Sequence, residues 1–404
     1  MLRTFITTAL AALLVAGGAV SLAAQQVVDR SADAPVHMGP LALEPSFQLT
    51  NLGIDTNVFN SVDNPQRDFT MTMEPQTLAW LHLGRGLLSA RLGAGLVYFR
   101  KFAGERAINT DNQVRFDLPL NRFRPYVVEQ YSNARQRPTE EIDARARYRD
   151  NATTVGVDLG LLSRTTVGVY GRRDQLAYAA NQQFFGADLA AALNRTEIAA
   201  GVDLKHELTP FTTLVLSGET ARDRFELSPD RNSRTVQGTL GVVLSPAALI
   251  SGNASVGYQS FEMPGAHVSS YHGLTATAGV GYVLLGVTRF DVQVTRQVQY
   301  SFDGNTPYYV LSGVSGSVSQ ELFGPVSLVI NGANQQLAYR AAAGVPESFA
   351  RTDTAQTYGG GLSFRVGPTF DISALADEYQ RTSPADLRQF KDLRFGISIS
   401  YGKQ

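Results

Sequence analysis

Residues 287–300 read VTRFDVQVTRQVQY, and their side chains alternate between two kinds. One parity is apolar and the other is polar or charged: Phe290, Val292, Val294, Val298 and Tyr300 against Arg289, Asp291, Gln293, Thr295 and Gln299. A period of two is typical of a β-strand with one apolar and one wet face. The alternation is long enough for a tilted strand to cross a bilayer.

The same pattern recurs along the chain and predicts an all-β protein of about 18 strands, with 16 as the alternative. The expected ranges are 44–54, 68–83, 87–102, 110–120, 123–132, 143–161, 165–176, 192–208, 211–226, 233–244, 248–261, 270–284, 287–301, 308–323, 326–340, 355–366, 369–380 and 391–402. Short turns alternate with longer polar connections between these segments. That alternation favours a transmembrane antiparallel up-and-down β-barrel over a soluble sandwich or propeller.

Aromatic residues near strand ends suit the interface girdles of such a barrel, where a ring has one apolar and one hydrated side. They are Trp80, Tyr98, Tyr126, Tyr258, Tyr282, Tyr300 and Tyr401.

The composition excludes several classes of protein. The 404 residues carry a net charge of −1 and include no cysteine. Near neutrality gives no reason to expect a nucleic-acid partner. Without cysteine the chain has no disulfides and no thiolate metal site. No apolar run after the first two dozen residues is long enough for a membrane helix.

The N-terminus has the three parts of a secretory signal. Arg3 precedes an apolar stretch, and small residues follow, so we expect a signal peptide over residues 1–24 that is cleaved near Ala23 or Ala24. A membrane anchor is the alternative. A short unstructured periplasmic leader, 25–43, would then lead into an outer-membrane barrel over 44–402 in a Gram-negative-type envelope.

The segment Gly53-Ile54-Asp55-Thr56-Asn57-Val58-Phe59 ends the first expected strand. Together with the polar loop after it and the next strand, which starts at Asp68-Phe69, it resembles the opening of the Putative beta-barrel porin 2 family of bacterial outer-membrane barrels. The resemblance implies a barrel without catalytic residues, and a role as conduit or accessory in exopolysaccharide export. Polysaccharide and periplasmic export components would then be partners.

A barrel of about 18 strands is wide enough for a water-filled channel. The polar parity would line its lumen: Arg91, Arg115, Asp117, Asp158, Glu197, Asp203, Lys205, Glu219, Arg289, Asp291, Arg365, Asp371 and Arg394. Either these charges are hydrated and mutually paired, or rings of charge bias which solute passes. Because the two signs nearly balance, we predict weak ion selectivity. A general diffusion porin for small hydrophilic solutes needs nearly the same walls and is the alternative function. No connection is long enough to predict an internal constriction.

Arg145, Arg147 and Arg149 share the parity of Val155, Val157 and Leu159, so they are expected to point outward above the apolar band. There they could bind lipopolysaccharide phosphates, although a solvated loop base is an equal alternative. Outer-membrane lipid and the barrel assembly machinery are further expected partners. Tyr401 is followed by three more residues, which displaces the terminal aromatic seen in many barrels.

An outer-membrane barrel hydrolase is the rival of another class. Ser269, Ser270, His272 and Glu262 could supply a Ser-His-acid set, but no nucleophile motif flanks them. His267 and His272 lack further ligands for a metal. Glu140 and Glu141 are interpreted as solvated carboxylates of an exposed loop. We expect no enzymatic activity, no catalytic residues, no metal and no cofactor.

Overall fold

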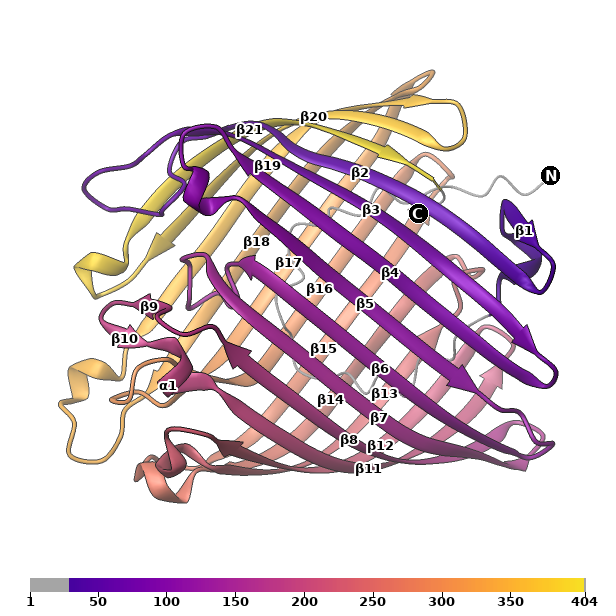
Figure 1. Cartoon of the computed structure of the whole chain (residues 1–404), viewed down its shortest axis with the longest axis horizontal. Coiled ribbons are helices and arrows are strands. Elements are labelled where there is room, and N and C mark those ends of the chain that lie inside the picture. The colour runs from indigo at the N-terminus through magenta and orange to yellow at the C-terminus, as the bar shows by residue number, and fades with distance from the viewer. Residues whose placement is uncertain (1–28, 403–404) are drawn as a thin grey trace.

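The computed structural model describes residues 29–402 and forms a closed antiparallel β-barrel (Figure 1). Nineteen of the described strands share one sheet, and eighteen of them make the wall once the short β1 is set aside. The wall strands pair in chain order, and β2 closes the ring by pairing with β21. The predicted fold class and its 18 strands are therefore confirmed.

The wall strands have these bounds: β2 Leu41–Asp55, β3 Asp68–Leu83, β4 Gly86–Phe99, β5 Ala107–Asp117, β6 Phe123–Gln136, β7 Ala146–Leu162, β8 Thr165–Tyr178, β11 Arg195–Thr209, β12 Thr212–Phe225, β13 Ser233–Leu244, β14 Ile250–Glu262, β15 Tyr271–Leu284, β16 Thr288–Tyr300, β17 Tyr308–Phe323, β18 Val326–Arg340, β19 Thr352–Val366, β20 Phe370–Thr382 and β21 Phe390–Tyr401.

Small elements lie at the two ends of the wall. They are the 3₁₀ turns Ser31–Asp33, Ala103–Glu105, Pro229–Arg231, Pro264–Ala266, Glu347–Phe349 and Asp386–Arg388, the strands β1 Val36–Met38, β9 Gln183–Phe184 and β10 Ala187–Asp188, and the helix α1 Leu189–Leu193. No helix within residues 29–402 is long and apolar enough to span a membrane.

The segment before the barrel differs from the expected unstructured leader. β1 pairs with the start of β2, which itself begins at Leu41 rather than at residue 44. The signal peptide expected over 1–24 lies outside the described residues.

The wall exposes apolar side chains and buries charged ones. On β11, Ile198 and Val202 are 56% and 49% exposed, whereas Asp203 and Lys205, of opposite parity, are 1% and 7% exposed. Water-soluble proteins show the reverse distribution, because burying a charge is costly without a partner. The outer surface is therefore suited to lipid and the polar parity faces inward.

One end of the barrel has short turns and the other has long loops. Between β15 and β16, Leu285 and Gly286 both have positive φ, 52° and 74°, and the Val287 amide donates to the Leu284 carbonyl. This is the backbone of a type I′ turn, whose twist matches that of the flanking strands. In outer-membrane barrels in general, the short turns face the periplasm and the longer loops face outward.

The segment that carries the family resemblance fastens the first strand to the last. A bulge at Asn51, whose φ is 53°, shifts the register of β2 and turns Asp55 inward. There Asp55 lies 3.3 Å from the Arg394 guanidinium of β21. The backbone amide of the buried Asn57 donates hydrogen bonds to the carboxylates of Asp55 and Asp392, both at 2.9 Å. The motif thus closes the barrel at its long-loop end.

The prediction that aromatic residues form a girdle on the outer surface is wrong for Trp80, Tyr126 and Tyr300. Tyr98, Tyr258 and Tyr401 are exposed on the outer surface. Trp80, which is 4% exposed, instead turns inward and packs on Ala34 and Ala42, and Tyr126 is also buried inside. Tyr300 lies against the Arg195 guanidinium within the barrel. Strand-end position alone does not show which face a ring occupies.

Candidate functional site

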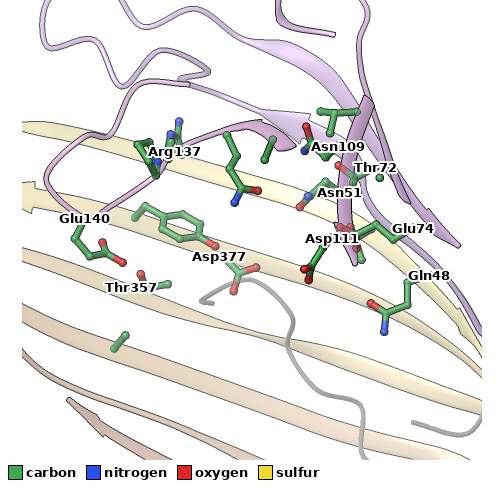
Figure 2. A pocket seen from close by; sticks show the side chains of 18 of the residues that line it. Gln48, Asn51, Thr72, Glu74, Asn109, Asp111, Arg137, Glu140, Thr357 and Asp377 are labelled. Carbon is green, nitrogen blue, oxygen red and sulfur yellow. The ribbon is translucent and has the colours of Figure 1, made fainter. Parts of the chain in front are cut away.

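The interior of the barrel contains two neighbouring hollows, each of about 1160 Å³. Arg91, Arg172 and Glu197 line both of them. Figure 2 shows the first hollow, with Glu140 pointing into it from a loop, Asp377 and Thr357 on one wall, and Glu74 and Asp111 near the other. Polar side chains from opposite sides of the barrel thus face a common space.

Most of the charged residues expected in the lumen border these hollows, and the rest are buried beside them. Those on the border are Arg91, Arg115, Glu197, Lys205, Glu219, Arg289, Asp291, Arg365 and Arg394. The buried carboxylates are Asp117, Asp158, Asp203 and Asp371.

Ion pairs join these charges in short ladders along the wall. The distances are 2.7 Å for Arg115–Asp117, 2.6 Å for Arg289–Asp291, 3.5 Å for Lys205–Asp158, 3.5 Å for Arg365–Asp371 and 3.6 Å for Arg91–Asp111. Pairing in a confined space removes much of the cost of burying each charge.

Two of these pairs follow a simple sequence rule. Arg115 and Asp117, and likewise Arg289 and Asp291, are two residues apart on one strand. Positions i and i+2 of a strand lie on the same face, so each arginine side chain lies beside the aspartate that follows two residues later. In both pairs the guanidinium donates two hydrogen bonds to the carboxylate.

A larger cluster centres on Arg172, which is not among the residues that the sequence predicted to line the lumen. Its guanidinium donates to Glu197 at 2.7 Å and lies 3.4 Å from Glu219. Tyr170 donates its hydroxyl to Glu219 at 2.6 Å. The parity of Arg172, which it shares with Tyr170 on β8, is the signal that would have placed it inside.

Three neighbouring strands carry no charge on the inner face. On β13, β14 and β15 the side chains that line the bore are hydroxyls, amides and glycine: Thr235, Gln237, Thr239, Ser251, Asn253, Ser255, Gly257, Gln259, Thr275 and Thr277. The bore therefore has a charged wall on one side and an uncharged polar wall on the other.

The loop 137–145, between β6 and β7, packs inside the barrel. Glu141 and Ile142 are 0% and 1% exposed. Ile142 belongs to an apolar cluster with Tyr178, Leu189 and Phe302. Loop length alone did not predict this placement: the loop is short, and the buried Ile142 anchors it in the interior.

Glu141 joins this loop to the tip of another hairpin. Its carboxylate accepts hydrogen bonds from the Ser301 hydroxyl at 2.6 Å and from the Phe302 amide at 3.1 Å. Burial raises the pKa of Glu141 to about 7, although Ser301 and Arg388 favour the charged form. Its interpretation as a solvated carboxylate is thus wrong.

Arginines from β20 and from the β20–β21 connection hold the backbone of the loop 137–145. Arg381 donates to the Glu140 carbonyl at 2.8 Å and pairs with Asp143 and Asp353. Arg388 donates to the Glu141 carbonyl at 2.5 Å. These contacts join residues from the two halves of the chain, so sequence patterns of single strands could not reveal them.

The three arginines expected to meet lipopolysaccharide divide into two groups. Arg147 and Arg149 are exposed and share the parity of the outward Val155. Arg145 precedes β7, borders the first hollow, and lies 3.4 Å from Glu105 and over the Phe99 ring. The outward orientation predicted for Arg145 is wrong because this residue belongs to the crossing loop and not to the strand.

Comparison with known proteins places the chain in a family. The sequence profile described as "Putative beta-barrel porin 2" matches residues 34–402. The chain belongs to this family. It is therefore an outer-membrane β-barrel of the porin type, as the sequence resemblance predicted. No curated protein matches the chain.

Several solved porin structures are similar to the chain at low sequence identity. A BenF-like porin from Pseudomonas fluorescens Pf-5 is 11% identical, covering 89% of this chain and 98% of its own, with a TM-score of 0.49. Acinetobacter baumannii OccAB3 is 8% identical, covering 89% and 99%, with a TM-score of 0.49. Pseudomonas aeruginosa OccK2 (OpdF), solved in complex with glucuronate, is 9% identical, covering 90% and 98%, also with a TM-score of 0.49.

Proposed function

We propose that this porin-family barrel lets small hydrophilic solutes diffuse across the outer membrane, with little preference for either sign of charge. The observation that carries the proposal is the paired-charge lining of the bore beneath the loop 137–145. Ion pairs at 2.6 to 3.6 Å leave small net fields, and the uncharged wall of β13–β15 offers hydrogen bonds of both kinds. Such walls release a solute as readily as they bind it.

Exopolysaccharide export, the role implied by the sequence resemblance, fits this interior less well. An extended polymer needs a wide path through the bore. The loop 137–145 and the tip of the β16–β17 hairpin meet inside the barrel through Glu141, Ser301 and Phe302. This packing favours small solutes over a polymer.

Two measurements test the proposed function. Liposomes that contain the purified protein should swell with small sugars and progressively less with larger oligosaccharides. In planar bilayers, a salt gradient should give a reversal potential close to zero. A sealed barrel in both assays, or strong selectivity for anions or cations, would contradict the proposal. Loss of surface polysaccharide on deletion of the protein would favour export instead.

A further inference from the structure

Two arginines lie directly opposite each other on the outer surface of neighbouring strands. Arg222 of β12 is the register partner of Arg234 of β13, and both side chains are exposed; we name them the arginine pair. They share the parity of the lipid-facing Leu216 and Val236, so both point away from the bore. Arg224, two residues further along β12, is exposed on the same face. All three flank the connection between β12 and β13, at the long-loop end of the barrel.

No protein group neutralises these three side chains. Among residues 29–402, none of the three guanidinium groups makes an ion pair or donates a hydrogen bond. Glu262 of β14 is the register partner of Arg234, and Glu226 follows Arg224 by two residues, yet within the described chain neither carboxylate pairs with an arginine. Like charges directly opposite each other destabilise a pair of strands. An anion that accepts hydrogen bonds from both guanidinium groups removes this repulsion.

A strip of bare backbone lies on the outer face of the same two strands. Gly218 of β12 and Gly238 of β13 are register partners, four residues along each strand from the arginine pair, and we name them the glycine strip. A Cβ at either position would meet no atom closer than 3.9 Å, so no neighbouring side chain covers the strip. The exposed Val202 of β11 and Tyr258 of β14 border it on its two sides. The strip therefore offers a lipid chain a bed between two apolar side chains.

The arginine pair and the glycine strip together suit a lipid with an anionic head group. The two features are about 14 Å apart along the strands, at a rise of about 3.4 Å per residue. A phosphate monoester carries close to two negative charges at neutral pH, so it matches two guanidinium groups better than the singly charged phosphate diester of a phospholipid. Lipid A, the membrane part of lipopolysaccharide, combines phosphate monoesters with acyl chains.

We propose that the outer surface of β12 and β13 binds the lipid A part of lipopolysaccharide. One phosphate monoester bridges Arg222 and Arg234, Arg224 supplies a further donor, and one acyl chain lies on the glycine strip. The site is three strands away from Arg147 and Arg149 of β7. This inference requires the barrel wall and is independent of the proposed diffusion of hydrophilic solutes.

The first test is thermal unfolding of the full mature protein in detergent, titrated with bisphosphorylated lipid A. The lipid should raise the unfolding temperature of the native barrel, whereas lipid A without phosphates and inorganic phosphate should not. Replacing both Arg222 and Arg234 by Gln should weaken binding at least tenfold, because two charge-assisted contacts are lost. Replacing both Arg85 and Arg122 by Gln is the matched control, since these exposed arginines lie in short turns at the opposite end of the barrel.

Heat-modifiable migration on a gel checks that each variant forms a barrel. The proposal is overturned by an unchanged affinity when the arginine pair is replaced, or by an equal loss of affinity in the control variant. Equal stabilisation by phosphatidylglycerol would overturn the assignment to lipid A.

The second test reverses the charge of one member of the arginine pair. Arg222→Glu sets a carboxylate opposite Arg234, and its other register partner is the uncharged Ile198 of β11. The repulsion across the two strands then becomes an attraction. Without lipid, this variant should unfold at a higher temperature than the native barrel, and lipid A should raise that temperature no further. A rise with lipid A as large as that of the native barrel would overturn the site.

The third test concerns the acyl chain. Gly238→Leu fills the glycine strip and should lower the affinity for lipid A severalfold. Gly332→Leu is the matched control, because Gly332 shares the outward parity of Ile330 on β18, away from the arginine pair. Equal affinities of these two variants would overturn the placement of the chain on the strip.

Discussion

The hydroxyl of Ser301 donates a hydrogen bond of 2.6 Å to the carboxylate of Glu141, a residue 160 positions earlier in the chain. This contact joins the loop 137–145 to the tip of the β16–β17 hairpin in the interior of the barrel. Arg388 completes the junction from a third loop by donating to the Glu141 carbonyl. One buried residue, Glu141, thus links three connections, two through its carboxylate and the third through its backbone carbonyl.

The first prediction concerns pH. Burial raises the pKa of Glu141 from its ordinary 4.5 to about 7. Between these values the packed loop holds a proton that the released loop has lost, so packing weakens as pH rises through this window, by up to about 3 kcal/mol. Conductance should therefore increase from pH 4.5 to pH 7.5, and Glu141→Gln should remove the dependence. An unchanged pH slope in this variant would show that another group is responsible.

The second prediction concerns the arginine that holds the crossing loop. Arg388→Ala removes a hydrogen bond to the Glu141 carbonyl and a guanidinium that lies 5.0 Å from the centre of the Phe184 ring. A buried carbonyl without a partner costs about 1–3 kcal/mol. We expect a higher mean conductance and faster protease cleavage within 137–145. Lys391→Ala, at an exposed ion pair, should change neither.

The third prediction concerns ion selectivity. Arg172→Ala removes the cation that pairs with both Glu197 and Glu219, so these two carboxylates in the bore lose their shared partner. The reversal potential in a salt gradient should move toward cation selectivity. Arg173→Ala is the matched control, because the neighbouring side chain points outward and is exposed. A similar displacement in both variants would argue against a local effect in the bore.

The fourth prediction uses the single tryptophan of the chain. Trp80 packs inside the barrel on Ala34 and Ala42 and is 4% exposed. Brominated lipids should therefore quench its fluorescence weakly. Tyr98→Trp, in a protein whose Trp80 is changed to Phe, places the fluorophore on the outer surface and should be quenched strongly. Comparable quenching at both positions would place Trp80 at the lipid surface.

The fifth prediction concerns lipopolysaccharide. Arg147 and Arg149 are exposed on the outer side of β7, whereas Arg145 is turned inward. Replacement of Arg147 and Arg149 by Gln should lower the amount of lipopolysaccharide that co-purifies with the protein, because two bidentate phosphate ligands are lost. Arg145→Gln should leave that amount unchanged. An unaltered amount in the double variant would indicate that these arginines only solvate the base of the loop.

The sequence by itself determined the wall of the barrel. A strand such as Val326–Arg340 is a local feature, because a period of two assigns each residue to one face and turn residues mark the ends. Pairs such as Arg115 and Asp117 could be predicted for the same reason, since residues two positions apart on a strand share a face. The family motif was also local, and its role in closing the barrel became clear only in three dimensions.

Only the tertiary structure decided what occupies the interior. Glu141, Ser301 and Arg388 lie far apart in the chain, and each has the sequence context of an ordinary polar loop. The predicted outward orientation of Arg145 was wrong because side chains alternate between two faces only within a strand, and Arg145 precedes β7. At the end of β16, the Tyr300 ring packs inside the barrel at 5.0 Å from that of Phe225, a contact between strands that are far apart in the chain. The packing of the interior depends on the combined free energy of contacts among segments that are distant in the chain, and a local sequence pattern does not contain this information.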